Sequence, residues 1–138
     1  MNHLLLVKEL VQAYQAFEMH SGAHIKEMGL TTTQFDIVAT LGNQPPMTCK
    51  ELGEKTLVSK GTMTGVLERL ETKGLIEKFM NADDGRSYKI GLSKTGDKLF
   101  KKVFPEHVEH LGKAFRKLSK QELEQAVTVL KEVKAIFN

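Results

Sequence analysis

The sequence predicts a mainly α-helical protein that carries one small β-ribbon, and three observations support this fold class. Apolar residues recur at three- and four-residue steps over most of the chain, as expected for helices with one buried face. Two short runs with strand composition, 75–79 and 87–92, are joined by a charged turn at 81–86. Three predicted helix starts carry a capping pattern, in which a hydroxyl residue is followed three positions later by Glu or Gln.

Two helices are expected before the middle of the chain. An apolar stripe predicts the first from His3 to about His20, and its members are Leu6, Leu10, Ala13, Tyr14 and Phe17. Thr31, with Gln34 as its reciprocal partner, caps the second helix. Its buried stripe is expected to be Phe35, Val38 and Leu41, and the Gly-Asn-Gln-Pro-Pro run at 42–46 ends it.

Two shorter helices and the ribbon follow. The first begins at Thr48, where Glu51 is expected to complete a reciprocal capping box. The second begins at Ser59 and ends at Gly74, and its buried stripe is Met63, Val66, Leu67 and Leu70. Two short helices joined by a tight turn and followed by a β-ribbon predict a winged helix-turn-helix. The second of these helices is the one expected to enter a DNA major groove.

Two further helices complete the chain. The first begins near Ser93, should be kinked by Pro105, and carries Leu99, Val103, Phe104, Val108, Leu111 and Phe115 on its apolar face. The second is capped by Ser119 with Glu122, and it is expected to bury Leu123, Val127, Leu130, Val133 and Phe137. The winged helix is too small to cover these faces and that of the first helix. We therefore expect the terminal helices to interlock with a second copy about a two-fold axis.

Composition places bounds on the possible classes of protein. The 138 residues carry a net charge of only +3, with two basic and four acidic side chains in 1–46 against eighteen and thirteen in 47–138. The positive excess therefore lies where the winged helix is expected. A single cysteine excludes an intrachain disulfide, and the opening apolar run at 4–7 is too short for a signal peptide or a membrane span. We expect a cytoplasmic protein with no membrane segment.

Around the ribbon the sequence resembles a known family. Asp84-x-Arg86, followed by Leu92-Ser93-x-x-Gly96, resembles the wing signature of MarR-type (multiple antibiotic resistance regulator) transcription factors. Residues 30–38, 59–76 and 118–123 resemble the second helix, the recognition helix and the start of the last helix in that family.

The resemblance implies a single MarR-type domain over residues 1–138. Its winged helix-turn-helix would cover 30–95, and its dimerisation helices would cover 1–29 and 96–138. It also implies a repressor that binds double-stranded DNA at a palindromic operator as a homodimer and is released by a small ligand. No cofactor is expected.

The candidate DNA-contacting residues lie on the two short helices and the ribbon. Burying the stripe of the second short helix places Gly61, Gly65, Glu68 and Thr72 on the opposite face. The full candidate set is Lys50, Ser59, Lys60, Gly61, Thr62, Thr64, Gly65, Arg69, Arg86, Ser87 and Lys89. Arg86 is expected to reach a minor groove from the turn. The resemblance implies that Asp84 positions the basic groups of the wing and the recognition helix.

The ligand sensor is open to several interpretations. The resemblance implies a small aromatic or phenolic effector in a crevice that Phe17, His20, Phe35 and Phe104 could line, although aromatic residues at helical spacing are more often plain core. A zinc- or metal-responsive repressor is an alternative, because His20 with His24, and His107 with His110, could each share a helix face. Nearby Glu27, Glu106 and Glu109 could complete such a site.

Other functional classes find less support in the sequence. Cys49 is expected to be a small, partly buried and inert thiol, because it lies three residues before the buried Leu52. No nucleophile with a base and an orienting group can be identified, so an enzyme is not expected. A winged helix that binds only protein remains an alternative, since the net charge is modest for a DNA-binding protein.

Overall fold

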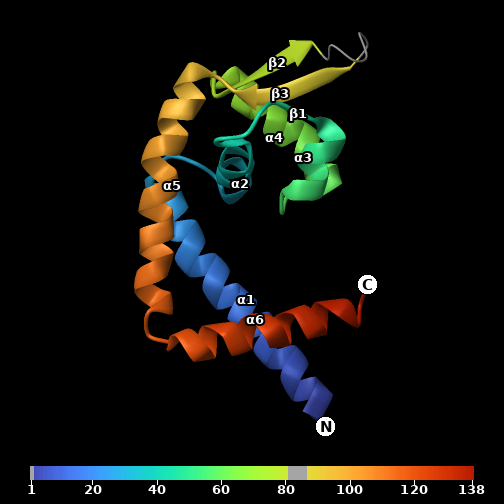
Figure 1. Cartoon of the computed structure of the whole chain (residues 1–138), viewed down its shortest axis with the longest axis vertical. Coiled ribbons are helices and arrows are strands. Elements are labelled where there is room, and N and C mark those ends of the chain that lie inside the picture. The colour runs from blue at the N-terminus through green and yellow to red at the C-terminus, as the bar shows by residue number, and fades with distance from the viewer. Residues whose placement is uncertain (1, 81–86) are drawn as a thin grey trace. The chain divides into compact units, whose positions relative to one another are not determined.

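The computed structural model describes residues 2–80 and 87–138, which form six helices and a three-stranded sheet (Figure 1). The elements are α1 Asn2–Glu27, α2 Thr32–Leu41, β1 Met47–Thr48, α3 Cys49–Lys55, α4 Lys60–Thr72, β2 Ile76–Met80, β3 Tyr88–Leu92, α5 Lys94–Phe115 and α6 Lys120–Ala135. The predicted fold class, mainly helical with a small β-wing, is confirmed. No helix in the described ranges is long and apolar enough to cross a membrane.

The chain forms two compact units, residues 1–107 and 108–138, and the division falls within α5. The first unit holds α1 to α4, the sheet and the beginning of α5. The second holds the end of α5 and all of α6. The assignment of 30–95 to DNA binding and of 1–29 and 96–138 to dimerisation stays a prediction.

The sheet is antiparallel, with strand order β1-β3-β2. The predicted ribbon is present as β2 and β3, which pair from Ile76 opposite Leu92 to Met80 opposite Tyr88. The third strand, β1, was not predicted. It pairs Met47 with Ile90 and Thr48 with Lys89, and two residues are too few to show the alternation that identifies a strand. The extra strand ties the start of α3 to the ribbon.

The core of the first unit is built from the apolar stripes of α2, α3 and α4, which lie on one side of the sheet (Figure 1). Ile37, Leu52 and Leu70 are completely buried. All four members of the predicted stripe of α4, and Val38 and Leu41 of α2, are buried as expected. This packing fixes which face of α4 is turned away from the protein.

The terminal helices differ most from the sequence-based expectations. Helix α1 runs on to Glu27, about two turns beyond the predicted end. Helix α6 contains no buried residue, and Val127, Leu130 and Phe137 are exposed in the single chain. The prediction that α6 buries its stripe is therefore wrong for one chain, because nothing within its unit is large enough to cover it.

Three of the four predicted helix starts have capping hydrogen bonds, but only two have the full capping box. Thr31 with Gln34, and Ser119 with Glu122, form the predicted reciprocal pairs. At α3 only half of the box forms, because the Thr48 hydroxyl, not its backbone amide, donates to Glu51. Ser59 occupies the N-cap position of α4 but makes no side-chain capping bond. Its hydroxyl lies 2.9 Å from that of Thr62 instead.

Residues of the wing signature connect the ribbon to α5. The Ser93 hydroxyl donates to the Gly74 carbonyl at 2.5 Å and accepts from the Gly96 amide at 3.0 Å. A Cβ on Gly96 would lie 2.0 Å from the Leu75 carbonyl oxygen, so no larger residue fits at this crossing. Gly74 has φ +74°, a conformation that suits glycine, at the end of α4. These contacts hold the start of α5 against the end of α4.

Candidate nucleic-acid interface

Helix α4 presents a small and largely uncharged face at its N-terminal end. Gly61, Thr62 and Thr64 are exposed, and Gly65 is half-buried. A Cβ built on Gly61 or Gly65 would meet no described atom within 4 Å outside its own helix turn. The protein's own packing therefore does not require glycine at either position. The absence of side chains leaves the helix backbone open to close approach from outside.

Lysines flank this face of α4. Lys50 on α3 and Lys60 in the first turn of α4 are exposed. Both line a hollow of about 300 Å³ between the two helices, together with Cys49, Gly53, Glu54, Met63 and Thr64. Ammonium groups around a helix N-terminus favour phosphate, since both the lysine charge and the helix dipole attract anions.

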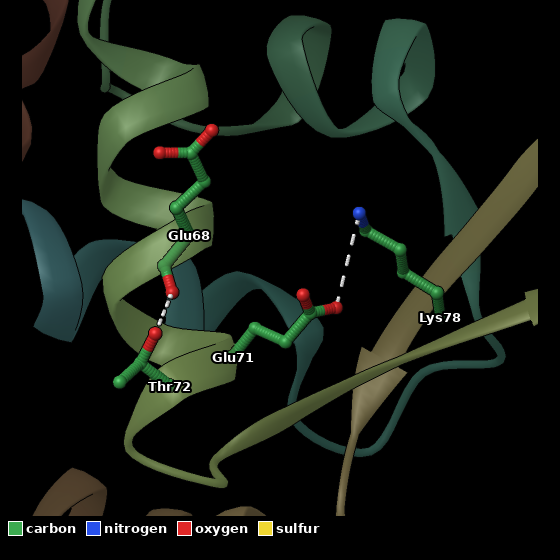
Figure 2. Close-up of polar contacts among 4 residues, drawn as sticks. All are labelled: Glu68, Glu71, Thr72 and Lys78. Carbon is green, nitrogen blue, oxygen red and sulfur yellow. Dashed lines mark hydrogen bonds and ion pairs between the residues drawn. The ribbon is translucent and has the colours of Figure 1, made fainter.

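A second hollow, of about 460 Å³, separates α4 from the wing strands. Lys78 of β2 lies in it, with its Nζ 3.9 Å from a Glu71 carboxylate oxygen and 5.9 Å from the centre of the Tyr88 ring. Figure 2 shows Lys78 reaching from the strand toward Glu71 at the end of α4. This ion pair joins α4 to the wing strands and places a basic group beside one carboxylate near the surface predicted to contact DNA.

The C-terminal half of α4 is less suited to phosphate. Glu68 is exposed and lies in the same hollow as Glu71. The Thr72 hydroxyl donates to the Glu68 backbone carbonyl at 2.9 Å (Figure 2), so this hydroxyl is engaged within the helix. Arg69 is exposed on the flank of the helix. The charge distribution favours approach of a nucleic acid to the N-terminal half.

The wing residues expected to matter most, Asp84 and Arg86, lie outside the described residues. Ser87 and Lys89, at the start of the return strand, are half-buried. Lys89 faces Phe79 in one neighbouring strand and Thr48 in the other. The structure therefore places the base of the wing beside α3 and leaves the assignment of Asp84 and Arg86 a prediction.

The four candidate ligand-binding residues do not form one group. Phe17 and His20 are exposed on α1. Phe104 stacks on Phe100 with ring centres 5.1 Å apart, whereas the Phe35 ring meets the edge of His107 at 4.7 Å. Phe35 thus contacts His107, a residue of the predicted histidine pairs.

The structure pairs the histidines differently from the sequence spacing. His24 and His107 approach with their Nδ1 atoms 2.9 Å apart, and His107 Nε2 lies 3.0 Å from the Ser21 hydroxyl. His107 is only 3% exposed. Ser21 was missed because an isolated serine in a helix gives no signal of its own. Among the described residues, no three His, Cys, Asp or Glu side chains are grouped to hold a metal ion.

The predicted burial of Cys49 is wrong. It was predicted to be partly buried, but it is exposed and lies on the rim of both hollows. Cys49 is the first residue of α3, and Leu52 is the residue of this helix that is buried in the core.

Two residues of α2 that were not predicted to belong to the interface contact the residues that flank α4. The Asp36 carboxylate accepts hydrogen bonds from the turn between α3 and α4. The Gln34 side chain accepts one from Lys73, the C-terminal cap of α4. Gln34 was recognised only as a capping partner, and a sequence does not reveal which turn a surface carboxylate reaches.

Comparison with known proteins places the chain among transcriptional regulators. Residues 30–88 match the model described as "MarR family". The chain is 28% identical over 127 residues to the uncharacterised HTH-type transcriptional regulator YkoM of Bacillus subtilis, covering 92% of this chain and 82% of the relative. It is 28% identical over 124 residues to the regulator MhqR of the same organism, covering 90% and 86%. The homoprotocatechuate degradative operon repressor of Escherichia coli is 26% identical over 136 residues, covering 99% and 92%.

Solved structures show the same fold. A MarR-like regulator from Bacillus cereus superimposes with a TM-score of 0.85 at 20% identity, covering 100% of this chain and 99% of that one. The Staphylococcus aureus MepR–DNA complex gives 0.81 at 21% identity, covering 94% and 96%. NadR in complex with 4-hydroxyphenylacetate gives 0.72 at 22% identity, covering 90% and 88%. These relatives and structural neighbours are regulators and not enzymes.

Proposed function

The chain belongs to the MarR family of DNA-binding transcriptional regulators, and from this premise we propose that it is a repressor that binds a palindromic operator as a homodimer. The N-terminal half of α4 enters the major groove in each half-site. Lys50 and Lys60 contact the phosphate backbone beside it, and the wing, with Arg86, reaches the adjacent minor groove.

The observation that carries this proposal is the exposed face of α4. Gly61 and Gly65 leave open space that the fold itself does not use, and lysines stand at the edge of that space. A surface that is slim in the middle and positive at its edge matches the shape and charge of a major groove between two phosphate strands.

Exposed apolar residues on the terminal helices support the homodimer. Leu4, Leu5 and Val7 near the start of α1 are at least half exposed, as are Val127 and Leu130 of α6. Apolar stripes of this extent are unusual on the surface of a monomer. A two-fold dimer would present two copies of α4 about one DNA turn apart, which requires an inverted repeat.

Operator selection followed by a spacing test examines the proposal. Duplexes bound from a random pool should share an inverted repeat whose half-sites lie about 10 base pairs apart. Inserting about five base pairs, half a helical turn, between the half-sites should abolish tight binding because the two recognition helices then face opposite sides. The logarithm of affinity should fall steeply with the logarithm of salt concentration. Selection of no repeat, or binding that ignores the insertion, would refute the palindromic dimer.

We further propose that a small aromatic or phenolic acid releases the operator. Phe35 and His107, with His24 and Ser21, bring an aromatic ring and hydrogen-bonding groups together between α1, α2 and α5. The names of the homoprotocatechuate repressor and of the NadR complex with 4-hydroxyphenylacetate support this class of compound for relatives. Operator affinity should fall when 4-hydroxyphenylacetate or a related phenolic acid is added to wild type. The effect should weaken in Phe35→Leu. An unchanged affinity across a panel of such acids would remove this class of effector.

A further inference from the structure

The turn between α3 and α4 is held by a single carboxylate from α2. One oxygen of Asp36, Oδ2, accepts hydrogen bonds from the Thr56 hydroxyl and from the Leu57 backbone amide, the latter at 2.7 Å. The Thr56 hydroxyl oxygen also lies 3.3 Å from the Val58 amide, which donates to it. A small network therefore connects α2 to three successive residues just before the recognition helix.

Backbone hydrogen bonds end α3 at Thr56 and begin α4 at Ser59, but the side chains of the turn itself add little direction. The Leu57 side chain is 93% exposed, so it adds no burial. Ser59, at the N-cap of α4, makes no side-chain capping bond. Val58 is buried, but apolar burial is non-directional and fixes position less sharply than a charged hydrogen bond. Packing of the buried stripe fixes which face of α4 is turned inward, and the hydrogen bonds to Asp36 add directional contacts next to its N-terminal end.

The C-terminal end of α4 is also hydrogen-bonded to α2. Lys73, the C-cap of α4, donates from Nζ to Gln34 Oε1 at 3.1 Å. The same oxygen accepts from the Thr31 amide at 3.2 Å, and Gln34 is only 4% exposed. Because Gln34 is fixed by the capping box of α2, it offers Lys73 a rigid acceptor.

We propose that Asp36 and Gln34 are positioning residues that set the angle of the recognition helix by holding its two ends against α2. Asp36 has the larger part, since it accepts two hydrogen bonds next to the end that enters the groove, whereas Gln34 accepts one from Lys73 at the far end. This inference rests on the proposed use of α4 to contact DNA.

Helix geometry shows why a small loss of anchoring matters. The 13 residues of α4 span about 20 Å at about 1.5 Å per residue. A tilt of about 5° about one end moves the other by about 1.7 Å, which exceeds the roughly 0.5 Å range of hydrogen-bond distances. Base contacts are therefore lost before the helix leaves the groove, whereas contacts to phosphates through flexible lysines persist.

The test compares binding to the selected operator with binding to a duplex of random sequence. In Asp36→Ala, operator affinity should fall about tenfold or more, because a tilted α4 loses contacts to base edges. Affinity for random duplex should be unchanged or slightly higher, because a negative charge has been removed. Asp36→Asn retains an acceptor oxygen and should lie between wild type and Asp36→Ala. Lys73→Met should also lower operator affinity more than random-duplex affinity, by a smaller factor.

Asp97→Ala is the matched control, since it makes the same charge change on α5, where Asp97 pairs with Lys101 at 2.8 Å. It should leave the ratio of the two affinities at the wild-type value. Wild type is measured alongside, and its failure to prefer any operator would refute the proposed function itself. With wild type specific, equal losses on both duplexes in Asp36→Ala, or no loss on either, would overturn the positioning role.

A second readout does not depend on DNA or on the most disruptive variant. The Leu57 amide donates to Asp36 and should be protected from hydrogen exchange in wild type, although its side chain is exposed. Thr56→Val preserves the shape of the side chain but removes one of the two donors, and it should lower operator affinity without lowering random-duplex affinity. Rapid exchange at Leu57 in the wild-type protein would contradict the anchor directly.

Discussion

At the scale of single residues, packing within the described part of the chain does not require glycine at positions 61 and 65. Glycine within a helix costs about 0.5–1 kcal/mol relative to alanine. Neither position has a neighbour that a Cβ would displace. A cost to stability with no packing reason is consistent with a requirement imposed by a partner, here the floor of a DNA groove.

Gly65→Ala should raise the free energy of unfolding by about 0.5–1 kcal/mol, and Gly65→Leu should also fold normally. Both should weaken operator binding, Gly65→Leu by roughly 1–3 kcal/mol, because added bulk holds the helix away from the base edges. Gly22→Ala on α1, where a Cβ would make an ordinary 3.6 Å contact with Thr32, is the control. It should leave operator affinity unchanged. Full operator affinity in Gly65→Leu would contradict close approach at this position.

Arg86→Ala should weaken operator binding by roughly 1–3 kcal/mol and reduce the preference for narrow minor grooves. The measurement is a titration of the operator at matched salt. Arg116→Ala removes the same charge from a residue that pairs with Glu109 at 2.8 Å in the second unit, and it should have little effect. Equal binding by wild type and Arg86→Ala would take the wing out of the interface.

At the scale of elements, the helix starts show which capping hydrogen bonds the local sequence can predict. The boxes at Thr31 and Ser119 form as predicted, since every atom they need lies within four residues. The other two starts differ from the pattern: Thr48 also belongs to a strand, where it pairs with Lys89, and the Ser59 hydroxyl lies against that of Thr62. Strand β1 was missed because its existence depends on a partner about forty residues away.

The capping box of α6 should depend on pH, because it contains the Glu122 carboxyl. The hydrogen bond from the Ser119 backbone amide holds the pKa of the Glu122 carboxyl below its ordinary value of 4.5. Below that ordinary value the unfolded chain takes up protons first, so stability rises with pH in this window. The contribution is complete above 4.5 and is lost as the pH falls through the lowered pKa.

The Ser119 amide resonance should therefore shift with pH around a midpoint below 4.5. Glu122→Gln retains a capping side chain without a charge, and its Ser119 amide should show no such titration. A wild-type midpoint at or above 4.5 would mean that the capping bond is not formed in solution.

At the scale of the whole molecule, the apolar faces of the terminal helices were predicted from periodicity, and so was their need for cover. The sequence places Val127 and Leu130 on one stripe of α6, and both are more than half exposed in the single chain. Periodicity identifies a face that must be buried but not the surface that buries it. The contact between His24 and His107 was likewise hidden, because helical spacing reports neighbours on one helix only.

Leu130→Glu should convert a dimer into a monomer at micromolar concentration, because a carboxylate in an apolar interface is left without a partner. Lys131→Glu, at the next and exposed position, carries a larger change of charge and should remain dimeric. Sedimentation would separate the two outcomes, and the monomer should lose the preference for inverted repeats over single half-sites. A wild-type protein that sediments as a monomer would contradict the proposed assembly.

The bare glycine face of α4 also bears on how binding sites for this regulator can evolve. Where a base pair lies opposite backbone and not opposite a side chain, one nucleotide can replace another at little cost as long as the local width and bendability of the duplex are kept. In an alignment of operators, the base pairs that face Thr62 and Thr64 should therefore be invariant, whereas those that face Gly61 and Gly65 should vary. Different promoters could then be bound by the same regulator because their operators share a duplex shape, although their base sequences differ.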